Sequence, residues 1–321
     1  MVLGGLCLSV EHAYILRDDV MNKIGAALHN RLSGFHYQII EHNGVKINVA
    51  TIGVGSPIVL LHGFPEMHLT WRFIAPELAK NHSVVCLDLR GYGESGKPKA
   101  DSQHANYSKR TMARDVLHVM AALGHTTFSV VGHDRGAMVA YRLALDHPGA
   151  VKKVVILDII PGIELWNVLS GVFGLFSYHM FFLAQNADFP ERMISASPKI
   201  FFDNTLNSWC KTPDAIPEDV RAVYLEAFSR PEAIMAMCED YRAGASIDIA
   251  HDAADQKAQK KIQAPTLVLW QDPGAFALPF DPLKVWKHWA KAVEGKAIVA
   301  GHFLQEEKPD EILANIRDFV A

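Results

Sequence analysis

Short apolar runs alternate with longer amphipathic segments along most of the chain. The segment from 106 to 124 has a polar start and apolar positions at helical spacing, and Gly124 is a typical helix stop. The strand-like runs are PIVLLHG, SVVCLDLRG, TFSVVGHDRG, VKKVVILDIIP and APTLVLWQD. Apolar strands that alternate with helices predict an α/β fold, in which a mostly parallel central sheet has helices on both faces.

Two segments near the N-terminus have different patterns. Residues 35–53 read as a β-hairpin, with Asn43 and Gly44 at the turn. Residues 1–33 are an extension of unknown role, with a helical pattern around 18–29. Their apolar start is interrupted by Glu11 and has no basic residues before it, so neither a membrane span nor a signal peptide is expected.

The alternation stops between 162 and 262, which separate two strands of the predicted sheet. This segment is rich in aromatic residues and mostly helical in pattern, as in GVFGLFSYHMFFLAQ and IPEDVRAVYLEAFSR. An insertion of this size after a sheet strand predicts a helical cap over the active site. The core of the fold is then expected to comprise residues 34–161 and 263–321.

Composition and charge limit the classes of function. The net charge is −4, from 31 basic and 35 acidic residues with no basic stripe, so nucleic acid is not an expected partner. Nowhere do 18 apolar residues run without a charged or polar interruption, so no membrane association is expected either. The four cysteines are widely scattered, which fits reduced thiols in the cytoplasm.

Neither a metal site nor a phosphate loop can be recognised in the sequence. GYGESG at 91–96 is rich in glycine, but it lacks the Gly-Lys-Ser/Thr ending of a phosphate-binding loop. The sequence therefore predicts no metal and no cofactor, and a small molecule as the substrate.

The stretch VVGHDRG carries the strongest chemical signal. Gly132 and Gly136 flank a strand-to-helix turn that would lift Asp134 above the sheet, as a nucleophile elbow does. A carboxylate at that point can attack an electrophilic carbon and form an ester, without a base to activate it. The alternative for Asp134 alone is an ordinary helix N-cap.

Other polar residues follow the ends of neighbouring strands. The turn in LLHGFPE can offer backbone N–H groups to an oxyanion, and His302 in AGHF can act as a general base. The histidine needs a carboxylate to orient it. Asp158 ends one strand and Asp272 the next, and spacing alone does not decide between them.

Together, HGFPE, GHDRG, LDIIP, DYRAGASIDIAHD and AGHF resemble the α/β-hydrolase-fold haloacid dehalogenases of the fluoroacetate dehalogenase type. The resemblance extends from about residue 35 to the C-terminus. Soluble epoxide hydrolases share the fold and the aspartate nucleophile and are close relatives. Proteins of this type are often dimers, so the resemblance also makes a homodimer an expectation.

The resemblance implies a role for each matching catalytic position. Asp134 matches the nucleophile, His302 the base that activates water, and Asp158 the acid, because this family places the acid after the strand that precedes the cap. Phe64 and Arg135 match the positions whose backbone N–H groups form the oxyanion hole.

The resemblance also implies substrate contacts. The Arg135 side chain matches one that binds the substrate carboxylate. His179 and Tyr241, both in the cap, match residues that surround the leaving halide.

Two positions depart from the fluoroacetate enzymes. Met138 stands where they have a second carboxylate-binding arginine, and Met180 stands where they have a tryptophan that donates to the halide. Both changes remove polar contacts, which favours a larger or less polar substrate. Tyr178 could instead form, with Tyr241, the tyrosine pair by which epoxide hydrolases protonate an opening epoxide.

Three hypotheses follow. The first is a hydrolytic dehalogenase of short 2-haloacids, the second an epoxide hydrolase, and the third a hydrolase-fold binding protein without turnover. The complete Asp-His-Asp set speaks against the third. Arg135 favours the first, because an arginine beside the nucleophile suits an anionic substrate, whereas epoxide hydrolases usually have tryptophan there.

Overall fold

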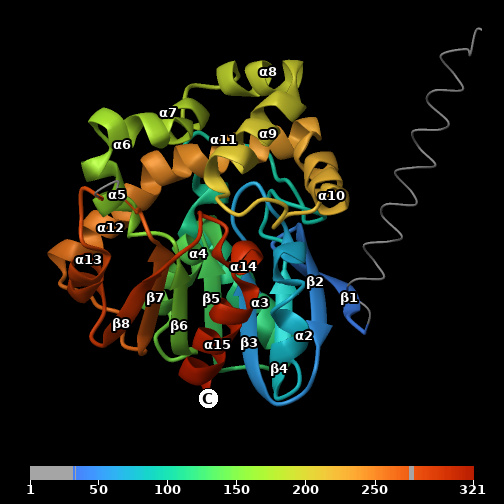
Figure 1. Ribbon diagram of the computed structural model, residues 1–321, viewed down its shortest axis with the longest axis vertical. Helices are drawn as coiled ribbons and strands as arrows, with labels where there is room; N and C mark the ends of the chain where they lie inside the picture. The colour runs from blue at the N-terminus through green and yellow to red at the C-terminus, as the bar shows by residue number, and fades with distance from the viewer. Residues whose placement is uncertain (1–31, 33, 275–277) are drawn as a thin grey trace, which may run out of the picture.

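The structure is a computed structural model that describes residue 32 and residues 34–274 and 278–321; the N-terminal extension lies almost wholly outside the described residues. Its centre is one eight-stranded sheet with the order β1-β2-β4-β3-β5-β6-β7-β8 (Figure 1). The strands are β1 (His36–His42), β2 (Val45–Ile52), β3 (Ser56–Leu61), β4 (His82–Leu87), β5 (Phe128–His133), β6 (Val151–Leu157), β7 (Thr266–Gln271) and β8 (Val293–Ile298).

Only the N-terminal hairpin breaks the parallel arrangement. β1 and β2 pair antiparallel around Asn43 and Gly44, which both have positive φ angles, of 51° and 75°, as a two-residue hairpin turn requires. β2 also pairs antiparallel with β4, and every other neighbouring pair is parallel. The predicted fold class, a mostly parallel sheet with helices on both faces, is confirmed.

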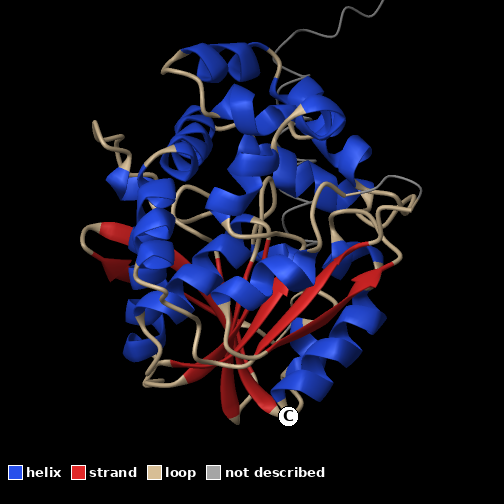
Figure 2. Cartoon of the chain, turned by 90° about the vertical axis from the view of Figure 1, so that its left-hand side faces the viewer, coloured by secondary structure: helices blue, strands red, loops and turns tan. Residues whose placement is uncertain are grey.

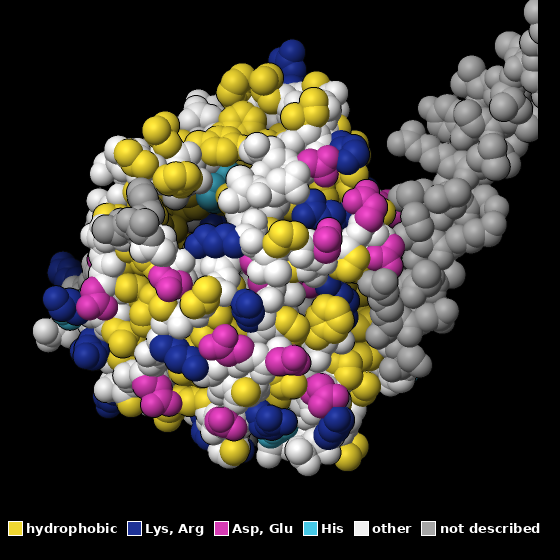
Figure 3. All heavy atoms as spheres, in the orientation of Figure 1, with side chains coloured by type: hydrophobic (Ala, Val, Ile, Leu, Met, Phe, Trp, Pro, Cys, Tyr) yellow, Lys and Arg dark blue, Asp and Glu magenta, His cyan; other side chains and the backbone are white. Residues whose placement is uncertain are grey.

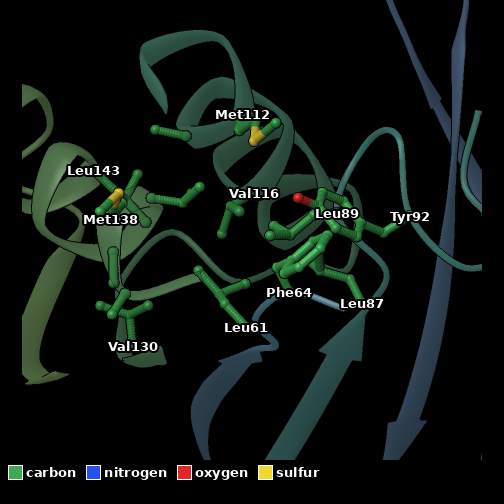
Figure 4. Packing of buried hydrophobic residues seen from close by; sticks show 14 of the residues in the cluster. Leu61, Phe64, Leu87, Leu89, Tyr92, Met112, Val116, Val130, Met138 and Leu143 are labelled. Atoms are coloured by element: carbon green, nitrogen blue, oxygen red, sulfur yellow. The ribbon is translucent and has the colours of Figure 1, made fainter. Parts of the chain in front are cut away.

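Alternate residues of the inner strands point to opposite faces of the sheet. On β3, Val59 and Leu61 belong to one buried cluster, whereas Ile58 and Leu60 belong to another. The first cluster lies under α3 (Lys109–Ala122) and α4 (Arg135–Asp146), and Figure 4 shows its packing. The second lies under α2 (Ala75–Leu78) and α15 (Pro309–Val320). Burial on both faces explains why these strands are apolar throughout.

Local sequence sets the ends of α3. The Ser108 hydroxyl accepts a hydrogen bond from the Thr111 N–H and caps the first turn, and Gly124, with φ of 84°, follows the last turn. The remaining core elements are the 3₁₀ turns η1 (His68–Trp71) and η2 (Ala105–Tyr107), and the helices α13 (Pro282–Trp289) and α14 (Leu304–Glu307).

Eight helices between β6 and β7 lie together over one end of the sheet (Figures 1 and 2). They are α5 (Gly162–Val168), α6 (Gly171–Phe176), α7 (Tyr178–Leu183), α8 (Phe189–Ala196), α9 (Pro198–Trp209), α10 (Glu218–Phe228), α11 (Pro231–Ala245) and α12 (Ile247–Lys257). We call these helices the cap. They cover the carboxyl ends of the strands, the edge at which ligands bind in parallel α/β sheets.

Strand register brings the sequence motifs together at this edge. Leu61 of β3 pairs with Gly132 of β5, and His133 of β5 pairs with Leu157 of β6. The residues that follow these strand ends therefore meet under the cap. β8 ends at Ile298, four residues before His302.

Candidate active site

Asp134 lies at a sharp turn between β5 and α4. Its backbone has φ 47° and ψ −116°, a strained conformation for a residue with a side chain, which costs about 1–3 kcal/mol. The flanking glycines permit the turn because a Cβ at Gly132 would lie 2.5 Å from the Gly136 carbonyl oxygen, and one at Gly136 would lie 2.4 Å from that of Leu61. The structure thus places Asp134 at the lifted position that the sequence predicted.

The loop after β3 faces the Asp134 carboxylate. The Phe64 backbone N–H donates a hydrogen bond to Asp134 Oδ1 over 2.8 Å. No hydrogen bond from the Arg135 N–H to this carboxylate is found in the described part of the chain. Of the two backbone donors predicted for an oxyanion hole, the resting geometry therefore engages one.

His302 lies between two carboxylates. Its Nδ1 is 2.7 Å from Asp158 Oδ2, and its Nε2 is 3.8 Å from Asp134 Oδ2. Because Nδ1 faces a carboxylate, it carries the proton, and Nε2 is directed towards Asp134 and any water beside it. Asp272 is not in contact with His302: its Oδ1 accepts from the Gly274 N–H. Geometry therefore decides between the two acids that spacing left open.

Sequence reasoning missed the residues that hold this arrangement. Gln271 donates its backbone N–H to Asp158 Oδ1 over 2.7 Å and its side-chain amide to Oδ2 over 3.0 Å. His133 Nε2 donates to the His302 carbonyl over 2.9 Å, and the Trp209 carbonyl accepts from the His302 N–H at the same distance. Gln271 directly precedes the rejected Asp272, but no sequence signal gives it this role.

The local charges keep both Asp134 and His302 ionised. Burial opposes ionisation of Asp134, but His302, His133, Arg135 and the Phe64 N–H outweigh it and lower the pKa of Asp134 below its ordinary value. Burial likewise favours a neutral His302, but the Asp158 carboxylate, assisted by that of Asp134, raises the pKa of His302 to about 9. At neutral pH the resting site thus holds a carboxylate beside an imidazolium.

Two cap side chains aim unpartnered polar atoms into the site. His179 Nδ1 on α7 and the Tyr241 hydroxyl on α11 are buried without a hydrogen-bond partner, as is His302 Nε2. Burial lowers the pKa of His179 to about 3, against the pull of Asp134, and it raises the pKa of Tyr241 well above 10. Both side chains are therefore neutral and close to the Asp134 carboxylate. Tyr241 can donate from its hydroxyl, and His179 can donate from Nδ1 in the tautomer that carries the proton there.

Aromatic rings enclose this space. The Trp209 ring, which the sequence did not single out, lies 4.5 Å from His179 and 5.1 Å from His302, between ring centroids. Phe64 lies 5.4 Å from Tyr241 in an edge-to-face arrangement. On the molecular surface a hollow opens between cap and core, with a histidine and basic side chains at its rim (Figure 3). The described residues include no cluster of histidine, cysteine and acidic side chains that could hold a metal ion.

The Arg135 guanidinium is buried, and Asp240 holds most of it. Its Nε and Nη2 bond both Asp240 carboxylate oxygens over 2.9 Å, and Nη2 also bonds the Asp240 carbonyl. Among residues 34–274 and 278–321, the acceptor found for Nη1 is Met138 Sδ, a weak one, at 3.4 Å. The guanidinium also lies over the Tyr241 ring, 4.2 Å from its centroid. Asp240 therefore occupies Nε and Nη2, and Nη1 has the weaker contact.

The remaining residues predicted to contact the substrate differ in burial. Met138 and Met180 are both buried. Tyr178 is 40% exposed, and its hydroxyl accepts a hydrogen bond from the Asn204 amide on the outer side of the cap. The structure does not bring Tyr178 and Tyr241 together as a pair; His179, the next residue on α7, takes the place opposite Tyr241, 5.7 Å between ring centroids.

Comparison with known proteins shows the family to which the chain belongs. The family model for the alpha/beta hydrolase fold matches residues 56–309. The chain belongs to the α/β-hydrolase family. The matched range of this hydrolase contains all of the cap, the elbow and His302.

This hydrolase is similar in sequence or structure to several known proteins. It is 37% identical to a fluoroacetate dehalogenase from Burkholderia sp, over 90% of this chain and 94% of that protein. It is 34% identical to a soluble epoxide hydrolase from Corynebacterium sp. (strain C12), over 89% and 97%. A provisionally assigned alpha/beta hydrolase from Nostoc sp PCC 7120 superposes with a TM-score of 0.88 at 44% identity, over 90% of this chain and 99% of that one. The chain is thus a hydrolase with similarity to both enzyme types.

The raised pKa of His302 predicts how stability depends on pH. A histidine whose pKa rises on folding contributes stability that is complete below its ordinary pKa of 6.5 and is lost as pH rises through about 9. The stability difference between wild type and His302→Gln should therefore shrink by up to about 3 kcal/mol over this range. Urea unfolding of both proteins at several pH values measures this difference in the free energy of unfolding. The exposed His36→Gln is the control, and a difference that stays constant with pH would contradict the prediction.

Proposed function

We propose that this hydrolase cleaves a bond between carbon and an electronegative atom through an ester on Asp134. One observation carries the proposal: the ionised Asp134 carboxylate lies between the Phe64 N–H at Oδ1 and the His302–Asp158 pair near Oδ2. Oδ2 is free to attack a substrate carbon, and the leaving atom departs with the bonding electrons.

The same geometry supports hydrolysis of the ester. Alkylation removes the negative charge of Asp134, which is one of the causes that raise the pKa of His302. His302 then releases its Nε2 proton to solvent. As a neutral imidazole it takes a proton from a water molecule, and Asp158 stabilises the imidazolium that forms again. As hydroxide adds to Cγ of Asp134, negative charge develops on Oδ1, where the Phe64 N–H already donates. Collapse of this intermediate releases the alcohol and restores the carboxylate.

The unpartnered donors of the cap suit a leaving atom that becomes negative. His179 Nδ1 and the Tyr241 hydroxyl are neutral, buried and aimed at the site. Hydrogen bonds from such groups strengthen as charge develops on the leaving atom, because a buried donor has no water to compete for.

The favoured substrates are short 2-haloacids. Arg135 follows the nucleophile directly, and the free Nη1 can donate to a substrate carboxylate. Binding would be weak, because Asp240 already occupies the other nitrogens and Met138 offers no second cation. The 37% identical fluoroacetate dehalogenase supports this substrate class.

Epoxide opening is the second candidate. The observation that favours it is that two buried cations, Arg135 and Lys109, are matched by the two carboxylates of Asp240 and Asp248, so a neutral substrate would meet little excess positive charge. Tyr241 and His179 would then donate to the epoxide oxygen, in place of the pair of tyrosines. The 34% identical soluble epoxide hydrolase supports this alternative.

A substrate panel separates the two. We expect slow halide release from chloroacetate and bromoacetate and less from fluoroacetate, because Met138 and Met180 stand where the resemblance implies polar contacts that a small, strongly hydrated ion needs. Met138→Arg should lower KM for these anions by roughly tenfold or more, since it adds a charge-assisted bond. Met138→Leu is the control for altered packing.

The contrary result is equally clear. The dehalogenase hypothesis would be wrong if the enzyme forms a diol efficiently from a neutral epoxide and releases no halide from any haloacid. Loss of diol formation in Tyr241→Phe would then support an epoxide hydrolase. Halide release and diol formation measured on the same enzyme preparation give both readouts.

A further inference from the structure

Four buried charged side chains of alternating sign extend from the nucleophile turn into the cap. They are Arg135 on α4, Asp240 on α11, Lys109 at the start of α3 and Asp248 on α12. Each of these residues is at most 6% exposed. We call the four residues the charge chain. Its two cations and two carboxylates balance, so its net charge is zero.

Hydrogen bonds and ion pairs join each member of the charge chain to the next. Asp240 accepts from Arg135 on both carboxylate oxygens over 2.9 Å, and its Oδ1 also accepts from Lys109 Nζ. The Lys109 backbone N–H donates to Asp248 Oδ1 over 2.9 Å, and Lys109 Nζ lies 3.4 Å from Asp248 Oδ2. The Tyr92 hydroxyl also donates to Asp240, over 2.7 Å. Lys109 therefore lies between two carboxylates.

Packing fixes the Arg135 end of the charge chain. The guanidinium lies over the Tyr241 ring, 4.2 Å from its centroid. A Cβ at Gly244 on α11 would lie 3.0 Å from Arg135 Nη2, so this glycine leaves the room that the guanidinium fills. Because Arg135 is held in place, a change of charge behind it should alter the electrostatic potential at the active site more than the position of the guanidinium.

Each member of the charge chain affects that potential with its own sign. Asp240 offsets the positive charge of Arg135, Lys109 offsets Asp240, and Asp248 offsets Lys109. Burial strengthens these effects, because little water lies between the groups to screen them. Burial also raises the pKa of Asp240, but Arg135 and Lys109 outweigh it and hold that pKa far below its ordinary value. Asp240 is therefore ionised at neutral pH.

We infer that Lys109 and Asp248 are specificity-determining residues, which set the net charge beside the nucleophile and thereby the preference for anionic or neutral substrates. The inference rests on the proposed function, in which Arg135 binds the carboxylate of a 2-haloacid. Without the charge of Lys109, one cation faces two carboxylates, and without that of Asp248, two cations face one. The two changes should therefore shift the affinity for an anion in opposite directions.

Binding of chloroacetate and chloroacetamide, an anion and a neutral molecule of similar shape, tests the inference. Ligand-observed NMR titrations in the Asp134→Asn background measure the dissociation constants without turnover, at about pH 8, above the ordinary pKa of histidine. Lys109→Met should weaken chloroacetate binding by roughly tenfold, and Asp248→Asn, one step further from Arg135, should strengthen it by roughly threefold. Chloroacetamide binding should change by less than about twofold in both variants, because the molecule carries no charge.

Asp255→Asn is the matched control. Asp255 lies on α12 like Asp248, is equally buried at 6% exposed, and also pairs with a buried cation, Arg142. This variant should leave the affinity for both probes unchanged. The double variant Lys109→Met with Asp248→Asn removes one charge of each sign and should bring chloroacetate binding back towards the background value. If Lys109→Met alone does not fold, tighter binding in Asp248→Asn and its reversal in the double variant decide the test.

A purely structural role predicts a different pattern, in which every variant binds both probes more weakly. The inference is wrong if Lys109→Met and Asp248→Asn shift chloroacetate binding in the same direction, or if neither shifts it. It is also wrong if chloroacetamide responds as strongly as chloroacetate, or if chloroacetate does not bind. Failure of the proposed function is separate: wild type would release no halide from chloroacetate, while the opposite shifts in binding would still support the inference.

Discussion

Asp134→Asn should reduce turnover of any substrate by at least about 10⁴-fold while the protein stays folded. The neutral amide keeps the shape of the carboxylate and an oxygen for the Phe64 N–H, but it has lost the nucleophilic charge. In water labelled with oxygen-18, multiple turnovers of wild type should place the label in the peptide that contains Asp134, because water attacks the ester at Cγ.

Asp272→Asn is the matched control, because it removes a carboxylate at the end of a neighbouring strand that does not contact His302. It should retain activity near the wild-type level. The covalent mechanism would be refuted if the label is found only in the product and the Asp134→Asn variant is active. Water would then attack the substrate directly.

His302→Gln should separate the two chemical steps. The Asp134 carboxylate needs no base to attack, so the ester still forms, but no group remains to activate water. An adduct of substrate mass should accumulate on Asp134 in intact-protein mass spectrometry, and steady-state turnover should fall by roughly 10³-fold or more.

Asp158→Asn tests the partner of His302. Without the carboxylate 2.7 Å from Nδ1, the imidazolium loses its stabilisation, so the ester should be hydrolysed more slowly by orders of magnitude. If turnover is lost but no adduct accumulates in either variant, the prediction is wrong. His302 and Asp158 would then act in formation of the ester, or only in holding the structure.

The site residues on the core could be predicted because they follow strand ends. A parallel sheet brings the carboxyl ends of its strands to one edge, so Asp134, Asp158 and His302 had to lie near one another once the strands were recognised. The two glycines around Asp134 are visible in the sequence, but the structure gives the reason for Gly136, because a Cβ there would lie 2.4 Å from the Leu61 carbonyl oxygen on β3.

The cap contacts were harder to predict because helix orientation decides them. Tyr178 and His179 are adjacent on α7, and the sequence offered both as contacts for the substrate. Neighbouring residues of a helix point about 100° apart, so only one can face the site. The packing of α7 against α11 turned His179 inward and left Tyr178 on the surface.

The sequence alone determined the sheet, the position of the elbow and the types of residue that could react, because each depends on local pattern and strand order. Only the tertiary structure decided which carboxylate contacts His302, since Gln271 and the register of β6 and β7 present Asp158 and not Asp272 to it. The tertiary structure also decided which carboxylate pairs with the Arg135 guanidinium. The sequence shows an arginine beside the nucleophile, but its charge is shared with Asp240, 105 residues away on α11, and such a pairing exists only in the folded chain.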